Sequence, residues 1–174
     1  MKSSNNKIKS LEEIIPIIDK LKTVGKKIVL SHGVFDLLHY GHIYYLQQAK
    51  KLGDILVVSS VIDKFVKKGP NRPIFNEKIR NNSLAALECV DYIIPCHDYG
   101  PWDIITTLKP HIYAKGEDSI SQLNDPGSGL NKDKKKIESI GGVLALTKSI
   151  DIHSTDLLRN YFNNLPPSVN SFIM

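Results

Sequence analysis

The chain has 174 residues, of which 41% are hydrophobic, and a formal net charge of +5. This size suits one globular domain with a single core and excludes a second large domain. The 23 Lys and Arg against 18 Asp and Glu suit a protein that handles anions such as nucleotides. The excess is far below the dense basic surface of a dedicated nucleic-acid binder, so we expect no nucleic-acid partner.

The cysteines and the N-terminus bear on the cellular setting. Cys89 and Cys96 are too far apart for C-x-x-C chemistry, and no zinc-site pattern of His and Cys surrounds them, so we expect reduced, structural residues and no metal held by the protein. The start, MKSSNNKIKS, has no apolar signal region, and no apolar run approaches the roughly 18 residues of a membrane helix. We therefore expect a cytoplasmic protein with no membrane partner.

The first element is predicted from apolar residues at helical spacing between Leu11 and Val24, with Gly25 as the stop signal. We expect this amphipathic helix to pack on the outside of the domain. Residues 1–26 are accordingly assigned to an N-terminal helix, 27–164 to the main domain and 165–174 to a C-terminal tail or linker.

The main domain alternates between two kinds of pattern. Short apolar runs predict strands at 28–30, 55–58, 92–94, 112–114 and 143–146. Helical patterns follow them at 41–52, 76–88, 102–108, 133–140 and 155–162. Strict strand-helix alternation with continuous apolar strands predicts an α/β fold, a single Rossmann-like doubly wound domain with a five-stranded parallel sheet. Glycine and proline predict extended loops at 67–76 and 117–136.

One motif stands directly after the first strand and before the first helix of the main domain, SHGVFDLLHYGH at 31–42. Ligands of open α/β sheets bind at the carboxyl ends of strands, where a helix N-terminus offers free N–H groups to phosphate. Gly33 permits close approach of a phosphate, and His39 and His42 suit donors to the charge that builds up when an α-phosphate is attacked. No enzyme nucleophile is needed, because the acceptor's phosphate oxygen attacks. His32, His97, His111 and His153 are interpreted as ordinary histidines.

The segment GVFDLLHYGH resembles the GxFDxxHxGH hallmark of the cytidylyltransferase-like nucleotidyltransferases, which have the HUP-type fold. The likeness covers roughly 28–162 and is greatest to heptose 1-phosphate adenylyltransferase domains and glycerol-3-phosphate cytidylyltransferases. It implies transfer of an adenylyl or cytidylyl group from ATP or CTP to a sugar phosphate similar to heptose 1-phosphate, with release of pyrophosphate and with Mg²⁺ carried by the nucleotide. Glycerol-3-phosphate or another polyol phosphate is the alternative acceptor, and a nucleotide-binding regulatory module is the alternative without catalysis.

The resemblance also implies roles for particular residues. Those with catalytic roles are His39, His42, Lys67 and Arg80. Those that bind nucleotide are Gly33, Val34, Phe35, Asp36, Gly41, Lys115, Gly116, Glu117, Ser154 and Thr155. Arg80 is placed on the triphosphate, with a solvated helix arginine as the alternative. Lys67 is preferred over Lys64 and Lys68 as the phosphate lysine, and Ser154 also suits a plain helix cap.

Partners follow from the same resemblance. The segments GPNRPIFNEKIR and 125–127 look like the adenylyltransferase part of two-domain proteins that also contain a sugar kinase. We expect a homodimer, with the kinase either fused in a longer protein or separate.

Overall fold

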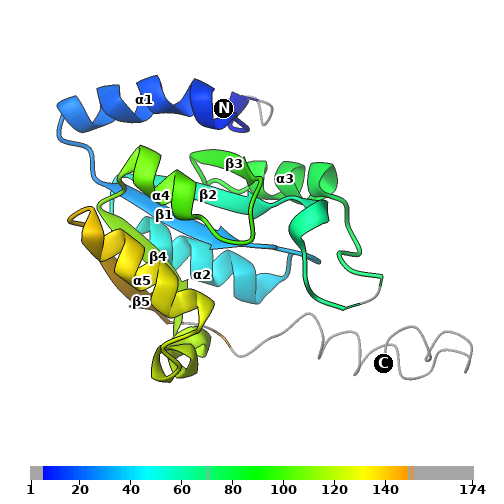
Figure 1. Ribbon diagram of the computed structural model, residues 1–174. Helices are drawn as coiled ribbons and strands as arrows, with labels where there is room; N and C mark the ends of the chain where they lie inside the picture. The colour runs from blue at the N-terminus through cyan, green and yellow to red at the C-terminus, as the bar shows by residue number, and fades with distance from the viewer. Residues whose placement is uncertain (1–5, 70, 149, 151–174) are drawn as a thin grey trace, which may run out of the picture.

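The computed structural model describes residues 6–69, 71–148 and 150, and these residues form a five-stranded sheet in the order β3-β2-β1-β4-β5 (Figure 1). All neighbouring pairs are parallel. The strands are β1 (Ile28–Gly33), β2 (Ile55–Val61), β3 (Tyr92–Cys96), β4 (Ile112–Gly116) and β5 (Val143–Thr147). The predicted Rossmann-like α/β fold with a five-stranded parallel sheet is confirmed.

Helices cover both faces of the sheet. They are α1 (Leu11–Thr23), α2 (Tyr40–Lys50), α3 (Glu77–Ala85), α4 (Trp102–Leu108) and α5 (Gly129–Ser139), with short 3₁₀ helices η2 (Asp63–Phe65) and η3 (Glu117–Asn124). Side chains of α1, α4 and α5 form one core with one face of the sheet, and side chains of α2 and α3 form a second core with the other. Burial on both faces explains why the strands are continuous apolar runs.

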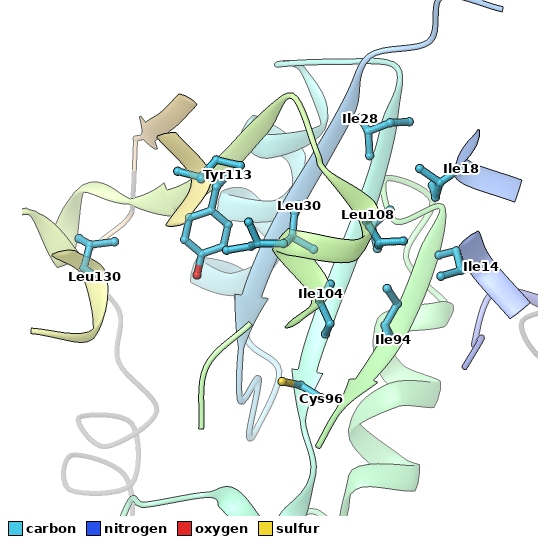
Figure 2. Close-up of a cluster of buried hydrophobic side chains, with 13 residues drawn as sticks. Ile14, Ile18, Ile28, Leu30, Ile94, Cys96, Ile104, Leu108, Tyr113 and Leu130 are labelled. Atoms are coloured by element: carbon cyan, nitrogen blue, oxygen red, sulfur yellow. The ribbon is translucent and has the colours of Figure 1, made fainter. Parts of the chain in front are cut away.

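The first helix packs as the sequence predicted, on the outer side of the domain. Ser10 and Glu13 form a reciprocal capping box at its start. Ile14 and Ile18 are fully buried and point toward Leu108 of α4 and the neighbouring strands (Figure 2). The buried side of this outer helix therefore contributes to the core that α4 and α5 form with one face of the sheet.

The segment 117–136 differs from the predicted extended loop. It forms η3 and most of α5, which begins at Gly129, four residues before the predicted start at 133. Ser128 caps α5 by accepting a hydrogen bond from the backbone N–H of Asn131 at 3.1 Å, and Leu130 and Ile137 anchor the helix in the core. The Gly, Pro and Lys content of the segment obscured this apolar spacing. The described residues of the predicted loop at 67–76 do lack helix and strand until the cap of α3.

The strand order creates a switch point. From β1 the chain proceeds outward to β2 and β3 and then returns to place β4 on the other side of β1. A crevice forms at the carboxyl ends of strands where the direction of winding reverses, which here lies between β1 and β4. Within the described residues, no helix is long and apolar enough to cross a lipid bilayer. The predicted helix at 155–162 and tail at 165–174 lie outside the described residues.

Candidate active site

Two stacked histidine rings mark the start of α2, directly after β1. His39 is the N-cap residue of α2, and its ring centroid lies 3.9 Å from that of His42. The backbone N–H of His39 donates to Nδ1 of His42 at 3.4 Å, so the proton of a neutral His42 ring is carried on Nε2. The buried Phe35 ring contacts His42 edge-on at a centroid distance of 5.7 Å. Both imidazoles are thus held beside the positive end of a helix, where an anion would bind.

The backbone between β1 and His39 is strained. Phe35 and Leu37 have φ angles of 53° and 51°, left-handed values that disfavour residues with a side chain. Each costs on the order of 1 kcal/mol and persists only where the surroundings impose it. Gly33 lies close to this turn, since a Cβ there would be 3.1 Å from the Phe35 ring. The motif therefore has one specific backbone conformation, which contacts with other residues must stabilise.

The carboxylate of Asp36 stabilises this backbone conformation. Its side chain is fully buried, and its carboxylate accepts hydrogen bonds from the backbone N–H groups of Ile74 at 3.0 Å and Phe75 at 3.1 Å. Nε of Arg72 forms an ion pair with the same carboxylate at 2.9 Å. The resemblance implies nucleotide binding for Asp36, which stays a prediction, and the contacts in the structure are with protein donors. Its role here is to clamp the histidine motif to residues 72–75.

Arg80 is a second internal connector, and the triphosphate contact that the resemblance implies for it stays a prediction. The residue is 1% exposed. Its guanidinium donates to five protein acceptors, which are the carbonyls of Phe75, Val34 and Val61, the hydroxyl of Ser60 and the carboxylate of Asp63. A guanidinium has five N–H donors, so these bonds employ all of them. Arg80 therefore ties α3 to the motif and to the end of β2, and in this arrangement it has no donor left for a triphosphate.

The phosphate lysine is expected on the loop after η2. Nζ of Lys67, the preferred candidate, lies over the ring of Tyr99 at 3.8 Å from its centroid. Partial burial lowers the pKa of Lys68, and the charges of Arg72 and Arg80 lower it further, against the opposing effect of Asp36. Lys68 thus interacts electrostatically with Asp36 and Arg72, and Lys67 as the phosphate ligand stays a prediction.

Lys115 lies near the carboxyl end of β4, the strand that pairs with β1 on the side away from β2. Its Nζ donates to the backbone carbonyl of His32 at 3.0 Å, which joins the ends of β1 and β4. Burial lowers the pKa of Lys115, while the carboxylates of Asp133 and Asp118 act in the opposite direction. A cavity of about 220 Å³ opens beside this ammonium group. Its polar lining includes His32, Trp102, Lys115, Ser119, Gln122 and Asp133.

His32 gives a pH-dependent prediction. Its Nδ1 hydrogen-bonds the Ser59 hydroxyl at 2.9 Å, and burial, with a contribution from Lys115, lowers its pKa well below the usual 6.5. We expect the free energy of unfolding to be fully retained above pH 6.5 and to fall below it, because the unfolded chain then binds a proton that the folded chain excludes. The loss is up to about 1.4 kcal/mol per pH unit until the folded pKa is reached.

Urea unfolding of the wild type and of His32→Gln, between about pH 5 and pH 7.5, measures this effect. Below pH 6.5, the free energy of unfolding of the variant should fall less steeply with decreasing pH than that of the wild type. The pKa of His111 is also lowered by burial, so the difference between the two proteins is the relevant quantity. An equal pH dependence of the free energy of unfolding in the two proteins would contradict the lowered pKa of His32.

The structure brings most of the expected residues to the switch point. Around the start of α2 it gathers Gly33, Val34, Phe35, Asp36, His39, Gly41 and His42. Lys115 and Gly116 end β4 on the other side of β1, and Glu117 begins η3. Ser154 and Thr155 lie outside the described residues. Sequence reasoning did not find Trp102 or Asp133, because a lone tryptophan and an aspartate among lysines carry no motif.

Comparisons with known proteins agree with this geometry. Residues 30–160 match the family described as cytidylyltransferase-like. The chain is 40% identical to the bifunctional protein HldE of Pelobacter propionicus over 87% of its length, and 42% identical to that of Geobacter metallireducens over 87%. In each case it spans 30% of the relative.

Solved structures point the same way. A lipopolysaccharide core biosynthesis protein from Thermoplasma volcanium is 31% identical, with a TM-score of 0.58 over 74% of this chain and 100% of that one. A pantoate-beta-alanine ligase from Francisella tularensis shares the fold, with a TM-score of 0.60 at 16% identity over 86% of this chain and 74% of that one. The motif, the sheet order and these matches agree, and the chain therefore belongs to the cytidylyltransferase-like nucleotidyltransferases.

Proposed function

We propose that this chain transfers an adenylyl or cytidylyl group from ATP or CTP to a sugar phosphate similar to heptose 1-phosphate and releases pyrophosphate. One observation carries the proposal. The stacked His39 and His42 begin α2 directly after β1, and Lys115, beside a cavity of about 220 Å³, lies near the end of the neighbouring strand β4, so both lie at the carboxyl ends of the strands. Two histidine donors and a small polar cavity with one ammonium group in its wall thus lie at the ends of adjacent strands, which suits two phosphorylated substrates.

The proposed chemistry needs no covalent intermediate on the protein. A phosphate oxygen of the acceptor attacks the α-phosphorus of the nucleotide, the bond from that phosphorus to the bridging oxygen breaks, and pyrophosphate leaves with the electron pair. His39 and His42 donate to the oxygens on which negative charge increases, and the dipole of α2 acts in the same direction. Lys115 neutralises the acceptor phosphate as it approaches. Positioning and electrostatics therefore account for the catalysis.

Mg²⁺ is proposed to arrive with the nucleoside triphosphate. Within the described ranges, no group of three His, Cys, Asp or Glu side chains could hold a metal ion. The carboxylate of Asp36, beside the motif, is already engaged by Ile74, Phe75 and Arg72. We therefore assign no side chain to the ion, which a nucleoside triphosphate can carry on its phosphate oxygens.

The proposal extends to the assembly and the setting. The relatives named above are described as bifunctional, and the chain spans 30% of their length. We propose that a sugar kinase, fused or separate, supplies the phosphorylated acceptor, that the protein forms a homodimer and that it works in carbohydrate metabolism in the cytoplasm. Gel filtration with light scattering tests the dimer.

The test of function is a pyrophosphate-release screen of ATP, CTP, GTP and UTP against sugar and polyol phosphates. We expect release that depends on the acceptor, with ATP or CTP and a sugar phosphate giving the highest kcat/KM. The size of the cavity, about 220 Å³, also suits a small polyol, so glycerol 3-phosphate with CTP is the second candidate. Nucleotide binding without release for any acceptor would contradict the proposal and favour a regulatory module.

A further inference from the structure

Asp133 occupies a position where the helix pattern calls for an apolar residue. It lies in a run of lysines on α5, yet it is 5% exposed and shares the buried face of the helix with Leu130 and Ile137. A charged side chain is rarely buried unless its charge is compensated or used. Packing alone would be satisfied by an apolar residue, so this aspartate requires an explanation.

Two aromatic side chains fix the orientation of this carboxylate. Oδ1 accepts a hydrogen bond from Nε1 of Trp102 at 3.0 Å, and Oδ2 accepts one from the hydroxyl of Tyr113 at 2.7 Å. These donors come from α4 and β4, and both are neutral. Burial raises the pKa of Asp133, although the attraction of Lys115 and the two hydrogen bonds oppose the rise. Each carboxylate oxygen has two lone pairs, so each retains capacity for one more donor.

The open side of this carboxylate is the cavity beside Lys115. The cavity has a volume of about 220 Å³, the scale of a small polyol or one sugar ring. Its wall carries an ammonium group and a carboxylate, which attract each other while their hydrogen bonds go to other protein groups. A ligand would match both groups if it had an anionic group that pairs with the ammonium of Lys115 and hydroxyl groups that donate hydrogen bonds to the carboxylate of Asp133.

We propose that Asp133 is a specificity residue that selects the acceptor by accepting hydrogen bonds from its hydroxyl groups, with Trp102 and Tyr113 as positioning residues for its carboxylate. The inference rests on the proposed function and deepens it, because it assigns one residue to the recognition of the hydroxyl groups of the phosphorylated acceptor. A site built to hydrogen-bond a substrate hydroxyl discriminates against an analogue that lacks it, because the remaining lone pairs of the buried carboxylate then have no donor. The residue that distinguishes hydroxylated acceptors from their deoxy analogues is therefore located on α5.

The test compares the wild type with Asp133→Asn in steady-state kinetics. Asparagine keeps the shape and can still accept from Trp102, but it replaces one carboxylate oxygen by a donor and removes the charge. We expect KM for a hydroxylated acceptor to rise about 10- to 100-fold, while KM for the nucleotide stays within about twofold. The preference for the hydroxylated acceptor over its deoxy analogue should fall by a similar factor. Glu138→Gln, on the same helix but outside the cavity lining, is the matched control and should leave both values unchanged.

The outcomes separate this inference from the proposed function. An active wild type whose acceptor ranking is the same in Asp133→Asn overturns the inference alone, whereas a wild type without acceptor-dependent turnover overturns both. If Asp133→Asn fails to fold by circular dichroism, Trp102→Phe decides, since it keeps a ring in place and removes one hydrogen bond to the carboxylate. A lowered preference for the hydroxylated acceptor in that variant supports the proposal, and an unchanged preference contradicts it.

Discussion

Alanine in place of His39 or His42 is expected to lower kcat by at least about a hundredfold while the fold is retained. Each imidazole is a preorganised donor at the N-terminus of α2, where charge on the phosphates increases during transfer. The loss of either ring also removes its neighbour's stacking partner at 3.9 Å, so the double variant should lose less than the product of the two single effects.

Steady-state pyrophosphate release measures these rates, and thermal unfolding checks the fold. His97→Ala is the matched control, because His97 is an exposed histidine outside the motif. A rate close to that of the wild type in either single variant would show that the histidine is not part of the catalytic group.

Replacing Arg80 by alanine is expected to lower both stability and activity. The change removes five hydrogen bonds and leaves the carbonyl of Val34 and the buried carbonyl of Val61 without this donor. We expect the free energy of unfolding to fall by about 2–4 kcal/mol, since each buried acceptor left unsatisfied costs about 1–3 kcal/mol. kcat should fall as well, because the backbone of the histidine motif, strained at Phe35 and Leu37, loses one of its supports.

This result distinguishes a connector from a phosphate ligand. A direct ligand would lose nucleotide affinity by calorimetry at nearly unchanged stability, whereas a connector loses stability even without nucleotide. Arg80→Lys should rescue little, because lysine has three donors on one atom and cannot reproduce the planar fork. Lys78→Ala, on the same helix, is the control. An Arg80→Ala protein of wild-type stability would contradict the connector role.

Much of the architecture could be predicted from local patterns. The strands at 28–33, 55–61 and 112–116 begin where apolar runs predicted them, because parallel strands buried on both faces need continuous apolar residues. The start of α2 follows from the motif itself. The pattern failed at α5, where capping by Ser128 and anchoring by Leu130 start the helix within a stretch that resembles a loop.

The sequence by itself thus determined the fold class, the family and the place of His39 and His42 between the first strand and the next helix, because these depend on residues close together in the chain. The tertiary structure alone decided which side chains are buried and what they contact. Arg80 meets Val34 across 46 positions, and Lys115 meets His32 across 83. Burial and hydrogen-bond partners depend on such distant contacts, which a local pattern of residue types does not encode. For that reason only the structure could reveal the internal hydrogen bonds of Arg80, whose contact with triphosphate stays a prediction, and the place of Asp133 in the cavity lining.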